Sequence, residues 1–308
     1  MSVKPPVWKK GDTIGIAAPA GPIKREELVR GIKIVESLGV HVKLGRHVHD
    51  KYGYLAGTDA ERAADLNDMF HDDEIKGIIC ARGGYGSGRI VELLDYEVIR
   101  QKPKVLLGYS DITYLHTAIR QRTGLITFHG PMVASDMGES GFAKLSYDLL
   151  QQFFIPQEIV YTTAISRLEV IVHGKASGPL VGGNLSLVTS TLGTPDEIDT
   201  KGKLLLLEDV DEQPYRIDSM LNQLKQAGKL RQAAGVVIGD FTNCDAKDPE
   251  TSLSFDQVLV DYFADLNVPI MKGFCIGHCN PNITIPLGTE ATMDTETKTL
   301  RVQAGVSA

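Results

Sequence analysis

The sequence has little of what marks a secreted, membrane-spanning or nucleic-acid-binding protein. Its first ten residues contain no apolar stretch like that of a signal peptide, and no segment approaches the roughly 20 apolar residues of a transmembrane helix. The net charge is −7 and there is no long basic run. We therefore expect a cytoplasmic protein whose partners include neither nucleic acid nor a membrane.

Cysteine is also scarce. The four cysteines form no Cys-x-x-Cys pair. Cys275 and Cys279 flank His278, but their spacing is not that of a usual zinc site, so we expect no metal and no other cofactor. Cys80 lies in an apolar run and is expected to be a buried thiol.

The bulk composition is that of a globular protein, with 43% hydrophobic and 23% charged residues in a chain of 308, enough for two domains. The first half alternates apolar runs with amphipathic segments, which predicts a parallel sheet with helices on both faces. The expected strands are 13–17, 40–44, 75–81, 105–108 and 125–128. The expected helices are 24–38, 58–70 (opened by a capping box), one through Leu94, 112–122 and 142–154.

The second half has a different pattern, mixed α/β with more β character. Strands are expected at 203–207, 235–238, 269–276, 291–293 and 299–302, with a helix at 214–227. Residues 156–163 have the character of a linker. We therefore predict an N-terminal domain over residues 1–155 and a smaller C-terminal domain over 165–308.

Four unusual loops follow strands of the predicted parallel sheet: 19–22, 82–88, 109–111 and 129–131. In such a sheet, ligands bind beyond the carboxyl ends of the strands. The loops therefore point to one shared site.

Ser110 lies where an apolar strand turns sharply into a helix. That geometry exposes a hydroxyl at the carboxyl edge of a sheet, beside backbone N–H groups at the helix start. Such a serine is a candidate nucleophile if a base and an acid reach it. Serine is also a favoured helix N-cap, and Ile112 replaces the second glycine of the usual G-x-S-x-G motif, so a capping role stays open.

The loop from Arg82 to Gly88 contains four glycines, which let the backbone approach a ligand closely. One interpretation is a nucleotide phosphate loop, but the match to G-x-G-x-x-G is imperfect and the lysine of a P-loop is missing. We favour an oxyanion hole or a carboxylate cradle.

Two further segments supply candidates for an acid and a base. Glu208 comes first after an apolar strand and is placed to orient a histidine; the alternative is an acidic turn in which Asp211 caps the next helix. His278 follows an apolar strand and precedes an Asn-Pro turn, which suits a general base. His129 is the rival base, and His116 is expected to pack or to face solvent.

Taken together, these residues resemble the LD-carboxypeptidase family, the muramoyltetrapeptide carboxypeptidases. The resemblance covers essentially the whole chain. The matching stretches occur in order at 11–21, 81–86, 107–111, 128–132, 182–185, 207–209 with 214–218, and 277–278.

The resemblance implies a serine peptidase without metal, in which Ser110 is the nucleophile, His278 the general base and Glu208 its orienting acid. Backbone N–H groups of Gly84 and Asp111 would form the oxyanion hole. It also implies a flavodoxin-like N-terminal domain, a homodimer, and removal of the terminal D-alanine from murein tetrapeptide, by cleavage of an L–D bond, during cytoplasmic wall recycling.

A carboxypeptidase also needs a cation or N–H cluster for the terminal carboxylate of its substrate, and Arg82, Gly83 and Tyr85 are the candidates. Two other functions stay open. Some members of the family confer microcin C immunity by cleaving an aminoacyl-nucleotide, and such an enzyme needs an aromatic surface on which the base stacks. The chain has a single tryptophan, Trp8, near its amino terminus, which favours the peptidoglycan substrate. A non-catalytic nucleotide-binding protein would keep its function when Ser110 is replaced by alanine.

Overall fold

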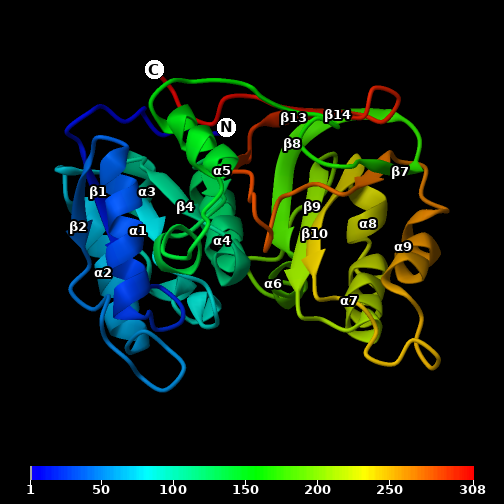
Figure 1. Cartoon of the computed structure of the whole chain (residues 1–308), viewed down its shortest axis with the longest axis horizontal. Coiled ribbons are helices and arrows are strands. Elements are labelled where there is room, and N and C mark those ends of the chain that lie inside the picture. Colours follow the sequence, from blue (N-terminus) through cyan, green and yellow to red (C-terminus); the bar gives the residue numbers. More distant parts are fainter. Residues whose placement is uncertain (1) are drawn as a thin grey trace. The chain divides into compact units, whose positions relative to one another are not determined.

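The computed structural model describes residues 2–308, which form two compact units (Figure 1). The first unit extends to Gln157 and also includes Asn280–Gly288 and Ala304–Ala308. The second comprises Glu158–Cys279 and Thr289–Gln303. The prediction from the sequence assigned both late segments of the first unit to the second domain. Periodicity alone does not reveal that the chain returns to its first sheet.

The first unit is built on a six-stranded sheet. Its strands are β1 (Thr13–Ala17), β2 (His41–Leu44), β3 (Ile75–Cys80), β4 (Val105–Gly108), β5 (Thr127–His129) and β12 (Ile285–Leu287). Their order is β12-β5-β4-β3-β1-β2, and all neighbours pair in parallel except β12 with β5. The order 2-1-3-4-5 is that of a flavodoxin-like doubly wound sheet, and it reverses between β1 and β3. The predicted fold class is confirmed.

Helices cover both faces of this sheet. They are α1 (Arg25–Ser37), α2 (Asp59–His71), α3 (Tyr96–Gln101), α4 (Thr113–Thr123) and α5 (Lys144–Leu149). Along β3, Ile79 packs into the core shared with α1, and Ile78 into the core shared with α2 and α4. This alternation is why the strands are apolar throughout. Cys80 is fully buried in the second core, as predicted.

Two helices predicted in this unit are shorter or differently wound. The segment before Leu94 forms two 3₁₀ turns, Ser87–Arg89 and Val91–Leu93, and not an α-helix. The helix expected at 142–154 is α5 followed by a 3₁₀ turn at Leu150–Phe153. The capping box expected at the start of α2 is confirmed.

The second unit contains an eight-stranded mixed sheet, in the order β6-β14-β13-β8-β9-β10-β11-β7. The strands are β6 (Ile159–Tyr161), β7 (Glu169–Val172), β8 (Lys175–Asn184), β9 (Leu204–Val210), β10 (Gly235–Thr242), β11 (Ile270–Lys272), β13 (Glu290–Asp294) and β14 (Thr299–Val302). The helices are α6 (Leu185–Ser190), α7 (Pro214–Gln226), α8 (Lys229–Gln232) and α9 (Phe255–Phe263). The expected linker at 156–163 therefore contains a strand, β6, and the strand expected at 269–276 ends at Lys272.

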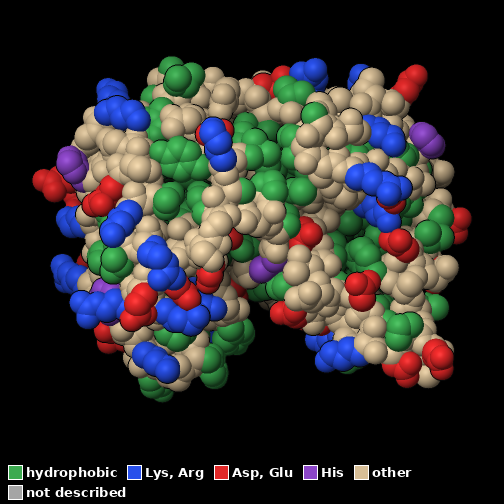
Figure 2. Space-filling model, viewed as in Figure 1, with side chains coloured by type: hydrophobic (Ala, Val, Ile, Leu, Met, Phe, Trp, Pro, Cys, Tyr) green, Lys and Arg blue, Asp and Glu red, His purple; other side chains and the backbone are tan. Residues whose placement is uncertain are grey.

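The central strands of this second sheet, β8 to β11, are parallel. One apolar core joins them to α6, α7 and α9. None of the helices in residues 2–308 has the length and apolar character needed to cross a membrane. Acidic and basic side chains are interspersed over the face of the molecule shown in Figure 2.

Candidate active site

Ser110 has a left-handed backbone conformation, with φ of 61°. It lies between β4 and α4, at the start of a 3₁₀ turn that ends at Ile112. Left-handed φ is uncommon for a non-glycine residue, and such strain gathers at active sites. The cap residue of α4 is Ile112, so Ser110 does not serve as the N-cap of that helix. The local geometry is that of a sharp strand-to-helix turn that presents a serine hydroxyl.

The glycine loop, residues 82–88, packs directly against this serine. A Cβ atom on Gly83 would lie 2.9 Å from Ser110 Cβ and 3.0 Å from its Oγ, so no larger residue fits there without displacement. Gly84 has φ of 117° and packs on Gly21, whose N–H donates to the Gly83 carbonyl at 3.0 Å. The loop after β1 thus supports the loop after β3, at the point where the strand order reverses.

Asp111 joins the glycine loop to the nucleophile turn. Its side chain is buried, and its Oδ2 accepts a hydrogen bond from Ser87 N–H at 2.8 Å, while the Ser87 hydroxyl donates to the Asp111 carbonyl. Burial raises the pKa of the Asp111 carboxyl. The backbone nitrogen of Asp111 lies 3.4 Å from the Cβ position built on Gly83. The two predicted oxyanion-hole residues, Gly84 and Asp111, therefore belong to loops in contact.

Two of the predicted substrate-binding residues differ in exposure. Arg82 is half-buried, and its Nη1 donates to the carbonyl of Pro22 at 3.1 Å. Tyr85 is 55% exposed and packs edge-on against Tyr54, with ring centroids 5.7 Å apart. Arg82 thus bonds within its own unit, whereas Tyr85 presents most of its ring to solvent.

Glu208 lies inside β9, which continues to Val210, and not after the strand as the sequence suggested. Its side chain is fully buried. A Cβ atom on Gly277 would lie 2.7 Å from Glu208 Oε2, and one on Gly239 would lie 3.1 Å from Glu208 Cβ. Glycine at position 277 makes room for the carboxylate, and glycine at position 239 makes room for the Glu208 Cβ and for the Ile276 carbonyl oxygen. Neither role was expected from the sequence, although Gly277 lies in one of the stretches that resemble the family.

His278 is paired with this buried carboxylate. Its Nδ1 lies 2.8 Å from Glu208 Oε2, and its side chain is 17% exposed. Burial raises the pKa of the Glu208 carboxyl, and the hydrogen bond and charge of His278 act in the opposite direction. When Nδ1–H donates to an ionised carboxylate, Nε2 carries the lone pair and can accept a proton. The pair therefore has the chemistry of an oriented general base.

Asp209 differs from its neighbour Glu208, because successive side chains of a strand point to opposite faces. Its carboxylate accepts hydrogen bonds from Asn184 Nδ2 at 2.9 Å and from the backbone N–H and hydroxyl of Ser186. Asp211, the proposed helix cap, accepts from Asn243 Nδ2 at 3.1 Å, and the cap position of α7 is Gln213. The acidic cluster therefore does not cap α7.

The rival histidines are core residues. His129 is fully buried in β5, with its ring edge-on to Tyr109 at 5.6 Å. His116 is also buried, its Nε2 lies 2.9 Å from the Gly108 carbonyl oxygen, and burial lowers its pKa to about 4. The contact between His116 and Gly108 holds the end of β4 in place, two residues before Ser110.

Within residues 2–308, one group of three potential metal ligands lies close enough to share an ion: His47, Asp50 and Glu61. His47 Nδ1 already lies 2.9 Å from Asp65 Oδ1, and Glu61 accepts from Thr58 in the capping box of α2. These contacts give His47 and Glu61 structural roles beside α2.

The protein belongs to the LD-carboxypeptidase family. Residues 14–130 match the family's LD-carboxypeptidase N-terminal domain, and residues 177–293 match its C-terminal domain. The family and the fold class expected from the sequence are therefore confirmed, and the chain is a hydrolase of the carboxypeptidase class.

Three relatives illustrate this similarity. The probable murein peptide carboxypeptidase of Bacillus subtilis is 52% identical over 100% of this chain and 96% of that protein. The crystal structure of muramoyltetrapeptide carboxypeptidase from Oxalobacter formigenes is 27% identical, with a TM-score of 0.84 over 94% of this chain and 97% of that one. The microcin C7 self-immunity protein of Escherichia coli is 26% identical over 95% of this chain and 93% of that protein.

Proposed function

We propose that the protein is a serine-type LD-carboxypeptidase that removes the terminal D-alanine from murein tetrapeptide in cell-wall recycling. The observation that carries the proposal is the left-handed backbone of Ser110 between β4 and α4, packed against Gly83, where a Cβ atom would come within 3.0 Å of the serine hydroxyl oxygen. Family membership and the 52% identity to a probable murein peptide carboxypeptidase support the substrate class.

In the proposed mechanism, His278 Nε2 takes the proton from the Ser110 hydroxyl as the oxygen attacks the carbonyl carbon of the L–D bond. Glu208 holds the Nδ1–H tautomer and stabilises the imidazolium that forms. The same imidazolium then protonates the departing amine of D-alanine. Water, deprotonated by His278, hydrolyses the acyl-enzyme and restores Ser110.

Backbone N–H groups of Gly84 and Asp111 are the proposed donors to the oxyanion. One such donor contributes about 3 kcal/mol to lowering the barrier in other serine hydrolases. We assign recognition of the substrate's terminal carboxylate to Arg82 and to the backbone of Gly83, with Tyr85 as an exposed contact beside them.

A substrate comparison tests this proposal. Purified protein is incubated with murein tetrapeptide ending in D-alanine, with the same peptide ending in L-alanine, and with an aminoacyl sulfamoyl adenosine. We expect release of D-alanine from the first peptide alone, measured by mass spectrometry. The L-alanine peptide is the matched control for stereochemistry at the bond.

Two results would overturn the proposal. Cleavage of the sulfamoyl adenosine with the tetrapeptide left intact would assign the chain to the activity named for its microcin C7 relative. Binding of a nucleotide without hydrolysis of any of the three compounds would favour a non-catalytic protein.

The location and assembly state belong to the same proposal. We assign the protein to the cytoplasm as a homodimer, as the family resemblance implies. Light scattering coupled to size-exclusion chromatography is expected to give twice the 33.5 kDa mass of the chain. A monomer mass at working concentration would contradict the dimer and leave the proposed reaction untouched.

A further inference from the structure

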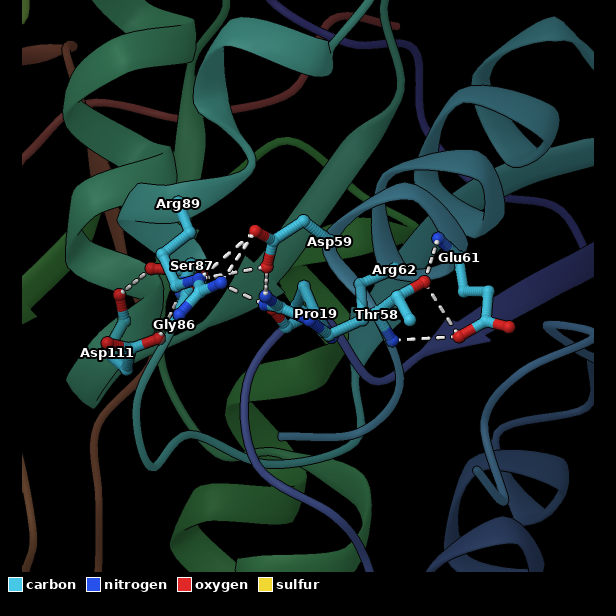
Figure 3. A network of polar contacts seen from close by, with 9 residues as sticks. All are labelled: Pro19, Thr58, Asp59, Glu61, Arg62, Gly86, Ser87, Arg89 and Asp111. Carbon is cyan, nitrogen blue, oxygen red and sulfur yellow. Dashed lines mark hydrogen bonds and ion pairs between the residues drawn. The ribbon is translucent and has the colours of Figure 1, made fainter. Parts of the chain in front are cut away.

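A single buried arginine joins two of the loops that surround Ser110. Arg62, on α2, is 1% exposed. Its Nη1 donates to the carbonyl of Pro19, in the loop after β1, and at 2.9 Å to the carbonyl of Gly86, in the glycine loop after β3. Figure 3 shows the guanidinium between these two carbonyl groups. Neither Arg62 nor α2 entered the site expected from the sequence.

Asp59 fixes the guanidinium on its other side. Arg62 Nη2 donates to Asp59 Oδ1 at 2.5 Å, and Arg89 donates to both oxygens of the same carboxylate (Figure 3). The hydrogen bonds of these two arginines lower the pKa of Asp59. Asp59 and Arg62 lie three residues apart on the first turns of α2, which the Thr58–Glu61 capping box holds in place. The arginine–aspartate cluster is therefore anchored on a capped helix.

From this cluster, a short series of contacts reaches the nucleophile. Arg62 holds the carbonyl of Gly86, and the next residue, Ser87, donates its N–H to the carboxylate of Asp111, which follows Ser110. The glycine loop is thereby fixed at its far end. Between this fixed end and β3 lie Gly83 and Gly84, which face Ser110 and the loop after β1.

We propose that Arg62 is a positioning residue for the oxyanion hole, setting the glycine loop so that the Gly84 N–H points at the developing oxyanion. The inference rests on the proposed serine-hydrolase function. Burying a guanidinium costs free energy that a packed apolar residue would avoid, so stability alone is a weak reason for arginine here. A planar group with several donors in fixed directions can bond two carbonyls and a carboxylate at once, and a lysine ammonium cannot match that geometry.

The test compares Arg62→Lys and Arg62→Ala with the parent enzyme. We expect Arg62→Lys to lower kcat about 10-fold and Arg62→Ala about 100-fold or more, because oxyanion donors act mainly in the transition state. KM for the tetrapeptide should stay unchanged. Added guanidinium ion should restore part of the kcat of Arg62→Ala by refilling the space. All rates are divided by the concentration of sites titrated with a fluorophosphonate, so that misfolded protein does not count.

Arg122→Lys is the matched control. Arg122 bonds Glu92 and stacks on Tyr96 at the far end of α4, so its replacement perturbs an arginine of the same unit without touching the glycine loop. We expect its kcat to equal that of the parent. A kcat per titrated site for Arg62→Lys equal to that of the parent would overturn the inference, whatever the loss of thermal stability.

The outcome can be separated from a failure of the proposed substrate. The rate of fluorophosphonate addition to Ser110 also depends on the oxyanion hole but needs no peptide. If the parent enzyme reacts rapidly with the probe yet does not cleave tetrapeptide, the substrate assignment fails. The inference about Arg62 then stands or falls with the slower labelling expected for Arg62→Lys relative to Arg122→Lys.

Discussion

The first and second units position their candidate catalytic groups by different physical means. In the first unit, a strained backbone presents Ser110, and a close approach by Gly83 shapes the space around its hydroxyl. In the second, a carboxylate fully buried inside β9 orients His278 through one hydrogen bond. Geometry dominates the first arrangement and electrostatics the second.

This difference separates the expected effects of substitution. Changes around Ser110 should act through the positions of atoms and depend little on pH. Changes around Glu208 should alter protonation, because burial already raises the pKa of that carboxyl.

Ser110→Ala should have the largest effect. Removing the nucleophile is expected to lower kcat about a million-fold, with the fold intact, because a catalytic set without its nucleophile loses nearly all its advantage. The kcat is measured as the rate of D-alanine release from tetrapeptide in samples quenched at fixed times. Ser37→Ala, which removes an exposed hydroxyl at the end of α1, is the control and should be fully active. An active Ser110→Ala enzyme would leave the first unit without a catalytic role.

Glu208→Gln should lower kcat about 10³- to 10⁴-fold by releasing the imidazole tautomer. Its effect on stability should depend on pH. The raised pKa means that the folded state holds the Glu208 proton more tightly than the unfolded state does. Stability from this group is therefore present below its ordinary pKa of 4.5 and is lost as pH rises through the raised value.

Glutamine does not titrate, so Glu208→Gln does not lose this stability as pH rises. The free energy of unfolding of the variant minus that of the parent should therefore increase between pH 4 and neutrality. Urea titrations at several pH values measure the difference. A difference that stays constant or falls over this range would show that burial does not raise the pKa of the Glu208 carboxyl. The second unit would then resemble the first in relying on geometry alone.

Gly83→Ala should lower kcat about 100-fold, since a shift of about 1 Å in a reacting group can cost that factor. The added methyl group would lie 2.9 Å from Ser110 Cβ, so one of the two must move. Gly193→Ala is the control: its backbone has φ of 76°, but no atom lies within 4 Å of the added carbon. The control should lose stability and keep its kcat. Equal rates for both variants would contradict a tight fit at Ser110.

Asp209→Asn should leave kcat unchanged, the smallest effect on activity. This carboxylate accepts hydrogen bonds from Asn184 and Ser186 on the face of β9 opposite Glu208. Losing a charged acceptor for several buried donors is expected to reduce the free energy of unfolding by about 2 kcal/mol. Chemical denaturation and tetrapeptide assays on the same preparation measure both values. A large fall in kcat would show that the two adjacent acids act together.

Much of the first unit could be predicted, because its strands and helices carry local signals. Buried runs such as 75–81 and the capping box at Thr58 depend only on neighbouring residues. By contrast, β12 could not be foreseen, since its three residues gain their pairing from β5, more than 150 positions earlier in the chain. The strand β6 inside the expected linker is short for the same reason and depends on β14.

The candidate site shows the same division. Apolar runs ending at polar residues identified Ser110 and Glu208, and the Glu208–His278 hydrogen bond joins two residues chosen from the sequence. The expectation that Glu208 follows the strand was wrong. A strand buried on both faces is apolar throughout, so the end of the apolar run suggested the end of the strand, whereas β9 continues to Val210. Arg62 was missed because an arginine on an amphipathic helix is normally exposed, and nothing local shows that two distant carbonyls enclose it.

In the proposed mechanism Ser110 and His278 take part in one reaction, and a double-mutant cycle measures whether they act together. The kcat for tetrapeptide hydrolysis is measured for Ser110→Ala, for His278→Ala and for the double variant. When two residues act as a unit, removing one already abolishes the contribution of the other to kcat. The double variant should therefore be no slower than the slower single variant. Losses that multiply in the double variant would show that the serine and the histidine work independently.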